Sequence, residues 1–147
     1  MADSLSLLRC LALVGAAQLL AACASEAEEP VLPPATVRNL MLGKTIPASN
    51  VVFAAAAEPP ASDQDWRQVG QSARTLAEAG LKLQLGAKGS GKDSWRRYAQ
   101  AMADAALKVA KAVDKHDVDA VSAAGNQVFE ACEGCHRSFY KKSETTG

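Results

Sequence analysis

Residues 117–140 read DVDAVSAAGNQVFEACEGCHRSFY, which is the pattern of one long amphipathic helix. Asp117 stands where an N-cap belongs, because its side chain can accept hydrogen bonds from free amides of the first turn. Apolar or small residues then recur every three or four positions, the spacing of one helical face. They are Val118, Val121, Gly125, Val128, Cys132 and Phe139. This stretch therefore predicts a helix that packs on a core through one side.

The end of this helix carries a CxxCH motif, Cys132, Glu133, Gly134, Cys135 and His136. The two cysteines lie one turn apart on the same side of a helix, so their thiols can meet the two vinyl groups of one porphyrin. His136 then directs its imidazole at the iron. CxxCH is the attachment signature of c-type haem. The sequence predicts one haem c, with its iron, per chain.

Without haem, the same motif has two other readings. It could be a redox dithiol, or it could supply half of a zinc site. A redox dithiol usually opens a helix after a strand, and zinc needs further ligands, and the sequence supports neither context. A haem-free thiol oxidoreductase stays a remote alternative.

Three further helical segments precede this one. The first runs from about Ala35 to Ala57, and Pro47 is expected to kink or divide it. The second is capped by Ser62, with Asp65 three residues later, and ends at Gly86; the third begins at Asp93 or Ser94 and ends before a turn at 114–117. No run of alternating β-branched residues indicates a sheet. The fold class is therefore all-α, an antiparallel four-helix bundle with covalently bound haem.

The N-terminal residues predict export. Residues 1–22 have the shape of a secretory signal, and the segment from Leu20 to Cys23 resembles the bacterial lipobox. That resemblance implies cleavage before Cys23 and lipidation of its thiol; ordinary cleavage after Ala24 is the alternative. Residues 23–34, rich in Glu and Pro, read as an extended tether to a haem domain at residues 35–147. We expect a periplasmic protein, lipid-anchored to the inner or the outer membrane.

Cysteine and charge accounting agree with this organisation. Cys10 leaves with the signal, Cys23 takes lipid, and Cys132 with Cys135 takes haem, so no disulfide is needed. The formal net charge is zero, and no long basic run indicates nucleic-acid binding. The remaining chain is long enough for one domain with one core.

The helical reading with CxxCH on the last helix, near the C-terminus, resembles the class II c-type cytochromes, the cytochrome c-prime family, over about Val37 to Lys142. Trp95 at the start of the third helix and Phe139 belong to the matched pieces. The resemblance implies that the first helix supplies the residue on the distal face of the haem, where Met41 lies. It also makes Arg38 and Lys141 candidates for contacts with the haem propionates, although this chain has Tyr140 where many members carry a basic residue. Family members often form homodimers.

Two functions follow from the role of Met41. A thioether opposite His136 fills the sixth iron position and suits electron transfer with redox proteins of a respiratory or related chain, with no enzymatic bond chemistry. If Met41 is only a core filler, the iron is five-coordinate and suits small gases such as NO or CO. Met102 and His116 are lesser alternatives for the ligand.

Several other residues have plainer expectations. We expect Met102 in the core, His116 in a solvated turn, and Trp66 and Trp95 as large core anchors. Gly125 and Gly134 either leave space beside the porphyrin or are tolerated helix glycines.

Overall fold

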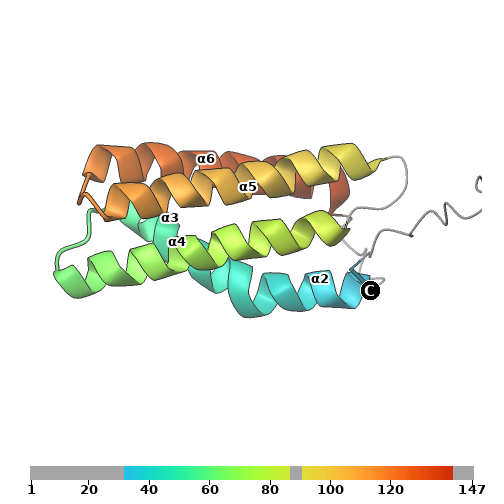
Figure 1. The fold of residues 1–147 in the computed structure, drawn as a ribbon, viewed down its shortest axis with the longest axis horizontal. Coiled ribbons are helices and arrows are strands. Elements are labelled where there is room, and N and C mark those ends of the chain that lie inside the picture. Colours follow the sequence, from blue (N-terminus) through green and yellow to red (C-terminus); the bar gives the residue numbers. More distant parts are fainter. Residues whose placement is uncertain (1–31, 87–90, 141–147) are drawn as a thin grey trace, which may run out of the picture.

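The computed structural model describes residues 32–86 and 91–140, which form an antiparallel bundle of four helical stretches (Figure 1). The first stretch consists of α2 (Pro34–Leu40), the π-helical turn η1 (Met41–Thr45) and α3 (Ile46–Ala57). The others are α4 (Asp63–Leu83) with the 3₁₀ turn η2 (Gln84–Gly86), α5 (Lys92–Val113) and α6 (Val118–Phe139). The predicted all-helical bundle is confirmed. The predicted signal segment, Cys10, Cys23 and Lys141 lie outside the described residues.

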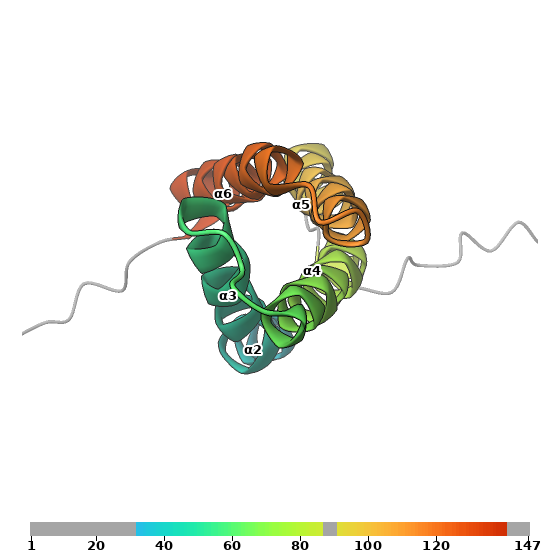
Figure 2. The same cartoon turned by 90° about the vertical axis from the view of Figure 1, so that its left-hand side faces the viewer.

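Viewed along its axis, the bundle places its four stretches at the corners of a square (Figure 2). Helix α5 packs on α4 and α6, and α3 closes the square by packing on the same two helices. Each stretch is antiparallel to the one before it, as short connections require. The C-terminal turn of α6, which carries the CxxCH motif, therefore lies at the same end of the bundle as α2.

Two of the predicted helix starts are capped as expected. Ser62 Oγ accepts a hydrogen bond from the backbone N–H of Asp65 at 3.2 Å, and an Asp117 carboxylate oxygen accepts one from that of Ala120 at 3.0 Å. The start of α5 differs, because the helix begins at Lys92 after Gly91 and has no side-chain cap. The prediction of Asp93 or Ser94 was late by a residue, which is within the usual fraying of helix ends.

Pro47 changes the type of helix instead of breaking it. Proline has no amide hydrogen, and its ring clashes with the carbonyl four residues earlier in a regular α-helix. The wider turn η1 comes directly before it, and there the N–H of Ile46 donates to the carbonyl of Met41. The hydroxyl of Thr45 donates to the carbonyl of Leu40 at 3.2 Å. The first stretch therefore continues past Pro47 without a loop.

The core is built from small side chains, so the helices approach closely. Alanine and valine dominate the buried residues, and the largest fully buried side chains are Leu76, Val52, Val109, Val121 and Val128. A Cβ on Gly80 would lie 2.7 Å from the carbonyl oxygen of Ala99, so α4 and α5 approach too closely there for any side chain. A Cβ on Gly125 would lie 2.8 Å from the Cβ of Ala56. Gly125 thus serves packing of α6 on α3, and of the two readings left open by the sequence this does not support space beside a porphyrin.

Helix α2 contributes no buried residue, although Val37 and Leu40 are partly covered. By length and composition alone Pro34–Ala57 could cross a membrane, with a mean hydropathy of 1.3. Core helices of bundles pass the same test, and α3 buries Ala48, Ser49, Val52 and Ala55 against its neighbours.

Candidate functional site

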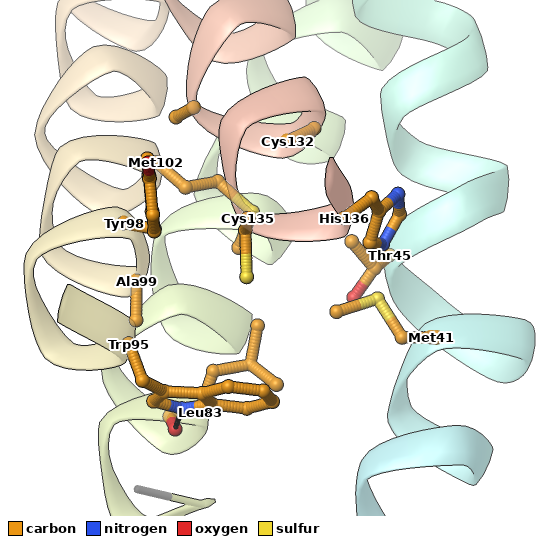
Figure 3. A pocket seen from close by; sticks show the side chains of 11 residues that line it. Met41, Thr45, Leu83, Trp95, Tyr98, Ala99, Met102, Cys132, Cys135 and His136 are labelled. Carbon is orange, nitrogen blue, oxygen red and sulfur yellow. Dashed lines mark hydrogen bonds between the residues drawn. The ribbon is translucent and has the colours of Figure 1, made fainter. Parts of the chain in front are cut away.

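The end of the bundle that carries the CxxCH motif has a small apolar hollow with a cavity volume of about 30 Å³ (Figure 3). Helices α4, α5 and α6 and the turn η1 all line it. Met41, Cys132, Cys135 and His136, predicted from the sequence as a group, are among the lining residues. The others are Thr45, Leu83, Trp95, Tyr98, Ala99, Met102 and Ala131.

The two thiols lie in apolar surroundings. Both cysteines are half-buried and neither forms a disulfide. Burial, and then the neighbouring Cys135, raise the pKa of the Cys132 thiol from its usual 9.0 to about 11. Burial also raises the pKa of Cys135. Both groups are therefore neutral thiols at neutral pH.

The imidazole of His136 is exposed, and it points towards the wall formed by η1, where Thr45 and Met41 lie (Figure 3). The ring centroids of His136 and Tyr140 are 5.8 Å apart. Among the described residues the imidazole has no hydrogen bond or ion pair. Both of its nitrogens are thus available to a ligand in the hollow.

A second, open hollow adjoins the first and reaches the surface between α2, η1 and the end of α6. We call it the groove; it holds about 1120 Å³, including open solvent. It shares Met41, Trp95, Cys135 and His136 with the enclosed hollow. Arg38 lines the groove, and its contact with a haem propionate stays a prediction; Lys141 lies outside the described residues.

Aromatic rings close the side of the site that faces α5. Trp95 and Tyr98 both pack edge-on against Phe139, with ring centroids 5.3 and 6.4 Å apart. The indole N–H of Trp95 donates to the carbonyl of Leu83. A Cβ on Gly134 would lie 2.5 Å from the Tyr98 ring, so only glycine lets that ring lie flush against α6.

The sequence interpretation missed five lining residues, Thr45, Leu83, Tyr98, Ala99 and Ala131. Tyr98 follows Trp95 by three positions and precedes Met102 by four, so the helical spacing of the third segment could have revealed it. Thr45 belongs to no motif in the sequence. Its buried hydroxyl lines the hollow, and only the π-helical turn accounts for its hydrogen bond to Leu40.

The two lesser candidates for the iron ligand, Met102 and His116, lie in different parts of the bundle. Met102 is buried and lines the enclosed hollow from the α5 wall (Figure 3). His116 lies at the opposite end of the bundle, at φ 52°, with its ring centroid 4.7 Å from that of Trp66. It does not line the site, so the structure contradicts its use as an alternative ligand. Glu133 is exposed and pairs with Arg137 at 3.0 Å.

A family model described as cytochrome C′ matches residues 63–140, just over half of the chain. The chain belongs to the cytochrome C′ family. It is therefore a c-type cytochrome, a haem-binding carrier of electrons or binder of gases. No curated protein and no solved structure matches it. The family match begins at α4 and ends after α6, so it includes the CxxCH motif but not Met41 or Arg38.

The residues at this site fit the haem c that the family implies. The groove is mainly apolar, as a porphyrin needs, and it adjoins the hollow that the two cysteines line. Two neutral thiols and an imidazole without a partner stand on one face of α6. A bound haem would supply a one-electron redox centre, while the protein determines its ligands, its solvent access and its surrounding charge.

Proposed function

We propose that this cytochrome is a monohaem electron carrier in which Met41 and His136 bind the iron from opposite faces. Cys132 and Cys135 would hold the haem through thioether bonds, one haem per chain. The observation that carries the proposal is that Met41 and His136, from separate helical stretches, line both the hollow and the adjoining groove. Met102 lines the hollow but not the groove.

The surroundings of the thiols argue against a haem-free redox dithiol. Thiolate is the nucleophile in disulfide exchange, and redox-active cysteines have lowered pKa values. At this site burial raises the pKa of both thiols. The motif is therefore poorly suited to thiol exchange at neutral pH and better suited to a permanent bond.

The apolar hollow and the charged groove beside it both suit electron transfer. The apolar walls of the hollow exclude water and so lower the local dielectric, which raises the sensitivity of the iron to nearby charge. A thioether and an imidazole that both stay bound would need little movement when the iron changes charge. Arg38 would offset the charge of a propionate at the open groove.

The test is an absorption spectrum of the matured protein, oxidised and reduced, with and without carbon monoxide. We expect sharp low-spin bands that do not change with carbon monoxide. Met41→Ala should turn the reduced form high-spin and open it to carbon monoxide, whereas Met102→Leu tests the rival thioether. If only Met102→Leu changes the spin state, the assignment of Met41 is wrong.

A gas-binding function is the second proposal, and the weak packing of α2 favours it. Met41 begins the π-helical turn, and the helix before that turn has no buried residue. The thioether can therefore leave the iron at a small structural cost. A high-spin reduced wild-type protein that binds carbon monoxide at once would replace electron transfer with this function.

We also propose that the protein is lipid-anchored in the periplasm and exchanges electrons with respiratory redox proteins there. The support is the signal-like segment 1–22 and the lipobox-like position of Cys23. Cys23→Ser should move the protein from the membrane fraction to the soluble fraction. An unchanged distribution would contradict the anchor.

A further inference from the structure

The charged side chains divide unevenly between the two ends of the bundle. The groove end consists of α2, η1, the second halves of α4 and α6 and the first half of α5 (Figure 1). Among the described residues it carries seven basic side chains, Arg38, Lys44, Lys82, Lys92, Arg96, Arg97 and Arg137. Four acidic side chains accompany them, Glu78, Asp93, Glu130 and Glu133. The described residues of this end therefore have a formal charge of three positive units.

The opposite end has the reverse balance. Apart from the pair Arg74–Asp114, it carries four basic residues, Arg67, Lys108, Lys111 and Lys115. Six acidic residues lie there, Glu58, Asp63, Asp65, Asp104, Asp117 and Asp119. The described residues of this end are negative by two charges. The described part of the bundle thus has a positive and a negative end.

The groove at the positive end is lined by exposed apolar side chains, which we call the apolar rim. Leu42, Ile46 and Tyr140 line the groove and are 54%, 44% and 69% exposed. Arg38 also lines it, has no hydrogen bond or ion pair among the described residues, and no carboxylate lines the groove with it. An apolar centre within a charged border is typical of surfaces that bind another protein.

We propose that the groove end is the docking surface for a redox protein with an acidic face. The proposal rests on the proposed function, because it needs a haem beside the groove. The two propionates of a haem c reduce the positive charge of this end but do not cancel an excess of three. The separated charges would orient an acidic partner before contact, and the apolar rim would then exclude water between the two surfaces.

The experiment uses the mature haem protein and two small oxidants of opposite charge. The reduced protein gives one electron either to hexacyanoferrate(III), an anion, or to tris(phenanthroline)cobalt(III), a cation, and stopped-flow absorbance follows the haem. Raising the ionic strength from about 0.01 to about 0.15 M shortens the Debye length from about 30 to about 8 Å. We expect the rate with the anion to fall roughly tenfold and the rate with the cation to rise.

Matched variants locate the effect. Lys44→Gln and Lys92→Gln remove charge at the groove end and should flatten the salt dependence with the anion. Lys111→Gln and Lys115→Gln remove the same charge at the opposite end and should leave that dependence nearly unchanged. Poly-glutamate, a surrogate for an acidic protein face, should slow the reaction with the anion, and poly-lysine should not.

The outcomes separate this proposal from the one on which it rests. If the mature protein lacks the spectrum of a covalent haem, the proposed function fails before any kinetics are measured. If the haem is present but salt affects the two oxidants alike, the docking surface is wrong while the cytochrome remains. Equal effects of the two pairs of variants would also overturn it, because the charge would then act without regard to its position.

Discussion

The two halves of the candidate site stand on regions of very different construction. Cys132, Cys135 and His136 belong to α6, which buries five residues and packs on α3 and α5. Arg38 belongs to α2, which buries no residue, and Met41 belongs to η1, which buries only Thr45. The family match covers the first region and stops short of the second. The residues proposed to attach the haem and the residue proposed to bind its distal face therefore stand on separate parts of the fold.

This difference has a physical consequence. A side chain on a well-packed helix is held by many contacts, so its position survives small changes elsewhere. A side chain on an exposed segment is held by few, and local opening there costs little free energy. Substitutions in α2 should leave haem attachment intact. They should weaken the binding of the iron by Met41. The following predictions test the contrast, beginning with the largest expected effect.

The first prediction separates attachment from ligation. Replacing both cysteines, Cys132→Ala with Cys135→Ala, should abolish covalent haem, because no thioether can form. Met41→Ala should keep one covalent haem per chain. Haem that remains with the polypeptide after denaturation and acid–acetone extraction measures both. Loss of covalent haem in Met41→Ala would mean that the two halves of the site depend on each other.

The second prediction compares two leucines. Leu76 in α4 is fully buried, so Leu76→Ala should lower the free energy of unfolding by about 2–5 kcal/mol. Leu42 in η1 is 54% exposed, so Leu42→Ala should change it by no more than about 0.5 kcal/mol. Urea unfolding of the haem protein, followed by circular dichroism, gives both values. Equal costs would show that η1 is packed as firmly as α4.

The third prediction compares two glycines and is the smallest in size. A Cβ on Gly80 would meet the Ala99 backbone at 2.7 Å, so Gly80→Ala should cost about 1–3 kcal/mol by forcing α4 and α5 apart. A Cβ on Gly43 meets nothing within 4 Å, so Gly43→Ala should gain up to about 1 kcal/mol of helix stability. Thermal unfolding distinguishes the signs. Destabilisation by Gly43→Ala would indicate that the π-helical turn needs glycine.

Much of the fold was predictable because its signals are local. The caps Ser62 and Asp117 act within a turn, and each of the apolar residues predicted along the second segment, from Trp66 to Leu83, is buried. The effect of Pro47 was predictable only in part. A proline indicates that a regular helix cannot continue unchanged, but whether it kinks, breaks or widens depends on what the neighbouring helices accept.

The candidate site divides in the same way. The CxxCH motif is a contiguous pattern, and its chemistry follows from residue types and spacing. Tyr98, Thr45 and Leu83 carry no motif, and they line the hollow only because three helices and the turn η1 meet there. The sequence left the role of Gly125 open for the same reason, since a glycine in a helix does not reveal which neighbour approaches it.

The amino-acid sequence by itself determined the helical class, the haem-attachment motif and the lack of net charge, because each depends on composition or on neighbours within a few residues. Tertiary structure alone decided that Met41 and His136 line one hollow, that Gly134 lies against the ring of Tyr98, and that an excess of the described basic residues lies at the groove end. Those features arise when residues far apart in the chain are brought together by antiparallel packing, and no local pattern records them.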